Sequence, residues 1–132
     1  MLSKTAEHAL RAMIFLARQD QDQLTSAEAI AKGVGAPQNY LGKTLGSLVS
    51  HGIVSSSPGR NGGFRLAMPA DELTIARVVD AVDPPAAQRT CLMGGRLCTE
   101  DEPCEAHLRW KVVLDLFRGH IESVTVADLL FG

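Results

Sequence analysis

The sequence predicts a mainly α-helical fold that carries one two-stranded hairpin and ends in a long helix. Apolar residues recur every three or four positions over residues 3–18, 37–51 and 105–124, which is the period of an amphipathic helix. Residues 53–67 form two short β-type runs around a Gly-rich tip, the pattern of a hairpin. A chain of 132 residues, 45% hydrophobic and 21% charged, has the size and composition of one compact globular domain.

The first two helices are predicted from the residues that can start them. Ser3 can cap a helix that runs to about Arg18 with its apolar side inward. After a polar loop, Thr25 and Glu28 have the T-x-x-E spacing of a capping box. We therefore expect the second helix to begin there and to end near residues 32–33.

A Gly-containing turn separates this short helix from the third. Pro37 fits the first helical position, where its missing N–H has no consequence, and His51-Gly52 ends the helix. Helix, turn and longer helix form the pattern of a helix-turn-helix, whose second helix reads the major groove of DNA. Its first N–H groups, like those near Ser26, can also bind phosphate. We expect DNA contacts from Gln38, Asn39, Tyr40, Lys43, Thr44 and Ser47.

The hairpin is the second candidate DNA-contacting element. Its tip, residues 58–63, contains glycines that let the backbone approach a ligand closely. Arg60 and Arg65 carry positive charge, which suits the negative potential of a minor groove, and Asn61 adds an amide. Many small interaction modules also combine helices with a hairpin. The order of the elements together with the cations favours a winged helix-turn-helix.

The C-terminal half contains a fourth helix, a long loop and the long helix. The fourth helix covers about residues 74–82, and residues 84–104 show neither helical nor strand period. A loop of this length calls for a functional reason, such as ligand attachment. The long helix 105–124 has an apolar stripe from Trp110 to Val124 that needs a partner surface, either a second copy or its own domain. A last short helix follows.

Charge is divided unevenly along the chain, although the net charge is only −2. Residues 1–70 hold seven Lys or Arg against four acids, and residues 71–132 hold six against eleven. This division is compatible with DNA binding by the first half. No run reaches the roughly 20 apolar residues that cross a bilayer, and no signal peptide is visible, so we expect a cytoplasmic protein without membrane contact. No catalytic nucleophile–base arrangement appears outside the cysteine segment, so we expect no enzyme.

All three cysteines lie within fourteen residues, in the pattern Cys91-x6-Cys98-x5-Cys104-x2-His107. Three thiolates and an imidazole suit an iron–sulfur cluster or zinc. Cys104 and His107 share one face at the start of the long helix, whose N-terminus favours the ligating thiolate. Zinc sites usually contain cysteine pairs two to four residues apart, so gaps of six and five favour a cluster. A disulfide switch is a further alternative, whereas three buried structural cysteines fit poorly in so polar a loop.

Several segments match a known family. They are Thr5–Arg11, Tyr40-Leu41 with Leu45 and Leu48, residues 51–54, residues 59–66 and the cysteine segment. On these residues, which cover nearly the whole chain, the sequence resembles the Rrf-two family of bacterial winged-helix transcription regulators, in particular its iron–sulfur members. The resemblance implies a homodimer that pairs through the long C-terminal helix and binds a near-palindromic double-stranded DNA operator.

The resemblance also implies that Cys91, Cys98 and Cys104 ligate an iron–sulfur cluster. A fourth ligand from His107 resembles the arrangement of IscR-type members and implies [2Fe-2S], which we expect first. Sensors of the NsrR type instead take a carboxylate from the first helix of the other subunit, with [4Fe-4S]. Glu7 lies at the matching position for this alternative.

The combined hypothesis is a homodimeric transcription regulator that senses cluster status, redox state or nitric oxide. It divides the chain into a DNA-binding domain (1–82), a cluster-binding loop (83–104) and a dimerisation region with the last helix (105–132). Expected partners are operator DNA, a second copy, and cluster-donating proteins or a small-molecule oxidant. One alternative is a cluster-free thiol–disulfide repressor. Another, from a different class, is a small iron–sulfur or zinc carrier protein.

Overall fold

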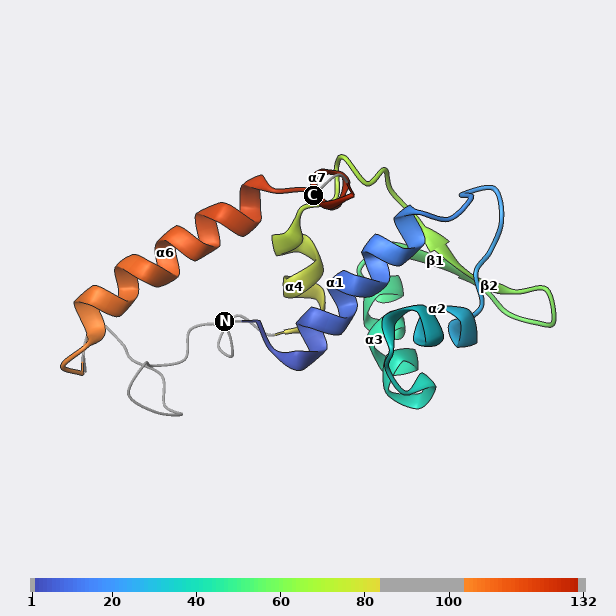
Figure 1. Ribbon diagram of the computed structural model, residues 1–132, viewed down its shortest axis with the longest axis horizontal. Coiled ribbons are helices and arrows are strands. Elements are labelled where there is room, and N and C mark those ends of the chain that lie inside the picture. Colours follow the sequence, from blue (N-terminus) through green and yellow to red (C-terminus); the bar gives the residue numbers. More distant parts are fainter. Residues whose placement is uncertain (1, 84–103, 131–132) are drawn as a thin grey trace.

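The computed structural model describes residues 2–83 and 104–130 and shows a helical body from which one long helix extends (Figure 1). The predicted class, mainly α with one two-stranded sheet and a long C-terminal helix, is confirmed. Helix α1 runs through the middle of the body and contacts α2, α3, α4 and β2. The described elements are α1 (Lys4–Ala17), α2 (Ala27–Val34), α3 (Gln38–Ser50), β1 (Val54–Ser57), β2 (Gly63–Leu66), α4 (Ile75–Val82), α6 (His107–Ser123) and α7 (Val126–Leu129).

Side-chain caps fix the starts of α1 and α4. The Ser3 hydroxyl accepts a hydrogen bond from the Ala6 N–H at 3.0 Å, as predicted. The Thr74 hydroxyl accepts one from the Arg77 N–H at 3.2 Å. Each cap satisfies a backbone donor that the first turn of a helix leaves unpaired, and it contributes about 1 kcal/mol.

The start of α2 differs from the prediction. Its N-cap is Ser26, whose hydroxyl accepts from the Ala29 N–H at 3.1 Å, so the capping box expected from Thr25 and Glu28 is wrong. The reason is a tertiary contact. Thr25 and Phe64 exchange two backbone hydrogen bonds of 2.8 Å, which hold Thr25 extended and move the cap one residue along.

The α2–α3 turn and the packing of α3 establish the helix-turn-helix. Gly35 ends α2 with φ of 78°, a left-handed conformation that glycine adopts without strain. Pro37 is the N-cap of α3 and not its first residue, a shift of one position from the prediction. Leu41, Leu45 and Leu48 are fully buried, so one face of α3 is fixed against the body and the opposite face is left to solvent.

The hairpin closes against the start of α2. Strands β1 and β2 are antiparallel, with Val54 opposite Leu66 and Ser57 opposite Gly63. Gly63 has φ of 151°, and a Cβ added there would lie 2.5 Å from the Thr25 carbonyl oxygen. Only glycine therefore lets the hairpin approach α2 this closely.

Two apolar clusters hold the structure together, and α4 belongs to both. Leu16 of α1, Leu48 of α3 and Val78 of α4 lie in the larger cluster. Val79 lies in the smaller cluster with Ile121 of α6. Consecutive residues of a helix point roughly 100° apart, so these two valines face different neighbours. Helix α4 thereby connects the helix-turn-helix to α6.

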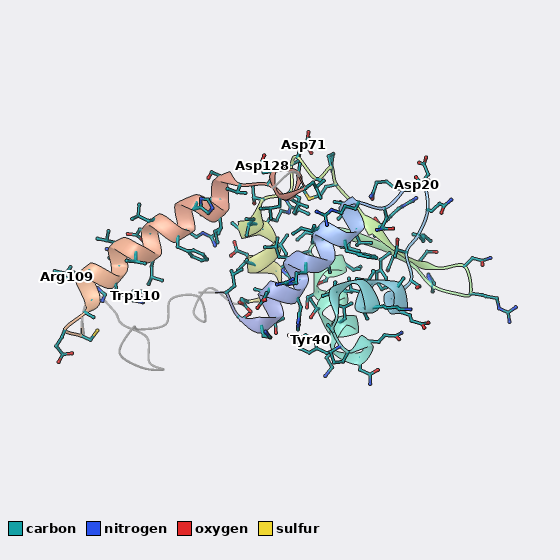
Figure 2. All side chains as sticks on the ribbon, in the orientation of Figure 1. Asp20, Tyr40, Asp71, Arg109, Trp110 and Asp128 are labelled. Atoms are coloured by element: carbon teal, nitrogen blue, oxygen red, sulfur yellow. The ribbon has the colours of Figure 1, made fainter. Side chains whose placement is uncertain are left out.

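Helix α6 begins at His107, two residues later than predicted, and its two ends differ in burial. Ile121 near its C-terminal end is 2% exposed, whereas Leu108 and Leu116 are 75% and 71% exposed. Figure 2 shows Arg109 and Trp110 at the outer end, away from the body. Within the predicted apolar stripe Ile121 alone is fully buried. Despite the length of α6, none of the described helices is long and apolar enough to cross a membrane.

Candidate DNA interface and candidate metal site

The exposed face of α3 carries polar side chains at its N-terminal half. Gln38, Asn39 and Lys43 are exposed, and Ser47 is half-buried. Amide, ammonium and hydroxyl groups at these positions can hydrogen-bond base edges and phosphates when the first turns of a helix enter a major groove. The structure thus leaves four of the six predicted α3 residues open to contact with DNA.

The other two predicted α3 residues face the body. Thr44 was expected to contact DNA, but it is 4% exposed and does not lie on the exposed face of α3. Tyr40 lies where α3 meets α1 (Figure 2): its hydroxyl is 2.6 Å from Thr5 Oγ1, and its ring meets the His8 ring edge-on at 5.4 Å. Positions 40, 44 and 48 share one side of a helix, so the burial of Leu48 is the signal that both residues turn inward.

A polar hollow of about 930 Å³ brings together predicted residues from two segments. Ser26 at the start of α2 and Asn61 and Arg65 of the hairpin line it. The Arg65 Nη1 group donates to the Gln21 carbonyl at 3.4 Å, while Arg60 stands exposed at the hairpin tip. Ser26, Asn61 and Arg65 thus line one hollow, a placement that spacing in the sequence does not reveal.

The described part of the candidate metal site is a turn directly before α6. The His107 N–H donates to the Cys104 carbonyl at 3.1 Å, which holds both residues at the outer end of that helix. His107 is buried, with 9% exposure, and Cys104 is half-buried. The predicted ligands Cys91 and Cys98, together with most of the predicted loop 84–104, lie outside the described residues.

The donor set fits the predicted cofactor in its chemistry. A thiol sulfur and an imidazole nitrogen are ligands that iron–sulfur clusters and zinc both accept. Within residues 2–83 and 104–130 no group of three or more His, Cys, Asp or Glu side chains is placed to hold a metal ion. A metal bound by Cys104 and His107 would therefore need further ligands from residues 84–103 or from a second subunit.

Glu7, the alternative fourth ligand, lies in the first turns of α1. Its carboxylate is 3.7 Å from Lys4 Nζ and 3.3 Å from Arg11 Nη2, and its side chain is 40% exposed. Ion pairs this exposed contribute at most about 1 kcal/mol each. Glu7 can therefore exchange these partners for another at small cost.

A bidentate ion pair between α4 and α6 was not predicted. Arg118 Nη1 and Nη2 donate to the two carboxylate oxygens of Asp80 at 2.8 and 2.7 Å, and Arg118 Nε donates to Glu122 at 2.6 Å. The hydrogen bonds to Asp80 and Glu122 raise the pKa of Arg118 above its ordinary value, and the one to Asp80 has the larger effect. The i,i+4 spacing of Arg118 and Glu122 is visible in the sequence, but Asp80 lies 38 residues away and leaves no local signal.

A helix-turn-helix followed by a hairpin with exposed arginines defines a winged helix-turn-helix DNA-binding protein. The profile of the Rrf2 (Rrf-two) family, described as "Iron-dependent Transcriptional regulator", matches residues 2–131. The chain belongs to this family, as the sequence predicted, and is a transcription regulator and not an enzyme.

Relatives and solved structures agree with this assignment. The chain is 31% identical over 132 residues to an HTH-type transcriptional regulator of Aquifex aeolicus, covering 98% of this chain and 91% of that protein. It is 29% identical to the regulator NsrR of Geobacillus kaustophilus, covering 98% and 88%. The structure of CymR, the global cysteine regulator of B. subtilis, matches with a TM-score of 0.78 at 25% identity, covering 98% and 95%.

Proposed function

We infer that this regulator is a homodimer whose affinity for operator DNA follows the state of an iron–sulfur cluster. Cys91, Cys98 and Cys104 would supply three ligands, and His107 or Glu7 of the second subunit the fourth. When bound, the cluster supplies a group that responds to redox conditions. The observation that carries the proposal is the turn at the outer end of α6, in which the buried residue His107 donates its backbone N–H to the Cys104 carbonyl.

The burial of His107 supports this assignment energetically. In the described residues, His107 and Thr44 are the polar side chains that are buried. An imidazole taken out of water costs free energy unless its nitrogens are hydrogen-bonded or bound to a metal. Metal coordination is one way to offset this cost. All three cysteines lie within a segment of seventeen residues that ends at this histidine, and this arrangement favours an iron–sulfur cluster as the bound group.

Homodimerisation is supported by the outer half of α6. Leu108, Val112, Val113 and Leu116 are 75%, 58%, 42% and 71% exposed, and adjacent exposed apolar side chains are typical of an interface. A two-fold dimer through this helix would present two α3 helices to half-sites about one DNA turn apart. We accordingly retain the division into DNA-binding (1–82), cluster-binding (83–104) and dimerisation (105–132) regions.

The similarity to CymR supports a second candidate function. That protein is named a cysteine regulator, and its fold covers 98% of this chain. Under this proposal the chain holds no cluster and senses oxidants through a disulfide between two of its three cysteines. The carrier-protein alternative is disfavoured, because the chain belongs to a family of transcription regulators.

The test is a visible absorption spectrum of protein purified without oxygen, with iron, sulfide and zinc measured on the same sample. Absorption bands at about 320–460 nm with equal iron and sulfide would establish a cysteine-ligated cluster. Stoichiometric zinc in a colourless protein would make the site structural. Protein without metal after anaerobic reconstitution would instead favour the thiol sensor.

Variants then assign the ligands. We expect Cys98→Ala to abolish the cluster while leaving a folded dimer. If His107 is the fourth ligand, His107→Ala lowers the iron content or shifts the spectrum, and Glu7→Gln leaves both unchanged. His120→Ala is the matched control, because His120 lies on the same helix and is exposed. Unchanged iron in Cys98→Ala would show that the ligand assignment is wrong.

A further inference from the structure

The ion pair between Asp80 and Arg118 lies where α6 joins the body. Both carboxylate oxygens of Asp80 accept from the guanidinium, at 2.8 and 2.7 Å. The side chains are 39% and 36% exposed, so the pair is partly solvated. A bidentate pair requires the guanidinium and carboxylate planes to align, which makes it directional in a way that apolar contacts are not.

The rest of the α4–α6 attachment combines apolar packing with a backbone hydrogen bond at the C-terminal end of α6, where the Ile75 N–H donates to the Val124 carbonyl at 2.9 Å. Ile121, one helical turn after Arg118, packs against Ile75, Ala76 and Val79 of α4. Apolar packing has no directional requirement, and the Ile75–Val124 bond lies at the very end of α6, so these contacts form a hinge about which α6 can pivot on α4. Arg118 supplies a second point of attachment one turn away, and two points fix an axis.

A hollow lies beside the Asp80–Arg118 pair. Its volume is about 380 Å³, and its lining includes Asp80, Arg118 and His51. His51 is the C-cap of α3, so the hollow borders both the recognition helix and α6. No side chain of residues 2–83 or 104–130 fills this space, so packing among these residues does not resist a rotation of α6 on this side.

A small rotation of α6 has a large effect at its outer end. From Arg118 to His107 the helix spans eleven residues, or about 16 Å at 1.5 Å per residue. A pivot of roughly 10° therefore moves the outer end by about 3 Å, which is close to the roughly 3.4 Å rise of one base pair. In a two-fold dimer both subunits contribute such a displacement.

We propose that the Asp80–Arg118 pair fixes the angle of α6 against α4 and thereby sets the spacing between half-sites that the dimer accepts. The inference rests on the proposed homodimer that pairs through α6. It assigns Asp80 and Arg118 as specificity-determining residues, although neither belongs to α3 or the hairpin. Their role is to position the two recognition helices.

The experiment measures spacing preference with the purified full chain. A DNA duplex selected from a random pool by the wild-type protein is rebuilt as a series in which the two half-sites are one or two base pairs closer or farther apart. Affinities are compared for wild type, Asp80→Asn, Arg118→Gln and Arg118→Lys. Glu122→Gln is the matched control, because Glu122 pairs with Arg118 within α6 and cannot set the angle to α4. Sedimentation and thermal melting are recorded for each.

We expect the wild type to prefer one spacing and the Asp80 and Arg118 variants to lose that preference by roughly three- to tenfold, as suits a partly exposed pair present twice in a dimer. Arg118→Lys tests whether the bidentate contact is required or the positive charge is sufficient, since lysine keeps the charge and loses the bidentate contact. A wild-type spacing profile in the folded Asp80 and Arg118 variants, or an equal loss in Glu122→Gln, would overturn the proposal. A wild-type protein that is monomeric would instead refute the proposed dimer, before any variant is measured.

Discussion

The two halves of α6 have opposite surroundings. In the outer half, from His107 to Leu116, four apolar side chains are more than 40% exposed. In the inner half, from Phe117 to Ser123, Ile121 is 2% exposed and Phe117 packs against the same cluster. One helix thus completes the core of its own subunit at one end and leaves apolar surface at the other.

Because of this difference, the free energy of folding and the free energy of association depend on different halves of α6. Contacts of the inner half contribute to the folding of the subunit, because their partners are on α1 and α4. Contacts of the outer half have their expected partner in a second copy, so they contribute to association. Substitutions in the two halves should therefore give different phenotypes.

The largest effect is expected at Ile121. Replacing it with alanine removes a fully buried side chain from the smaller cluster, which costs about 2–5 kcal/mol of the free energy of unfolding. Chemical denaturation at fixed protein concentration measures this loss. Ile121→Val should cost only about 0.5–1.5 kcal/mol, since it removes a single methyl group. A loss below about 1 kcal/mol in Ile121→Ala would mean that the inner half is not anchored as described.

A smaller effect, of a different kind, is expected at Leu116. Its side chain is 71% exposed in the single subunit, so Leu116→Ala should leave the subunit folded. If the outer half is the dimer interface, the same change removes apolar contacts worth about 1.5–3 kcal/mol and raises the dimer Kd at least about tenfold. Sedimentation equilibrium gives the Kd. Asp115→Ala is the matched truncation of an exposed polar neighbour, and an equal effect there would contradict an apolar interface.

Features that depend on near neighbours in the chain were predictable. The Ser3 cap is confirmed because a cap requires only a hydroxyl and the first turn of the helix that follows it. The start of α2 was missed because the contact of Thr25 with Phe64, 39 residues away, holds Thr25 in an extended conformation. Local sequence thus predicted that α2 exists, whereas a tertiary contact determines the residue at which it begins.

The candidate site divides in the same way. Helical period correctly placed Gln38, Asn39 and Lys43 on an exposed face, but it also placed Thr44 there, and Thr44 is buried. The choice between two neighbouring positions at the edge of a helix depends on what packs there. The cysteine ligands remain a prediction from spacing, since only Cys104 lies in the described part of the chain.

The smallest effect concerns Gly119, which lies in the inner half of α6. It is exposed in the helix interior, and a Cβ added there meets no atom within 4 Å. Gly119→Ala should therefore raise the free energy of unfolding by about 0.5–1 kcal/mol, because alanine loses less backbone entropy in a helix. Gly63→Ala is the contrasting control and should be destabilising, since its Cβ would lie 2.5 Å from the Thr25 carbonyl oxygen. If Gly119→Ala instead weakened the dimer, the second subunit would approach at Gly119, and the association surface would extend into the inner half.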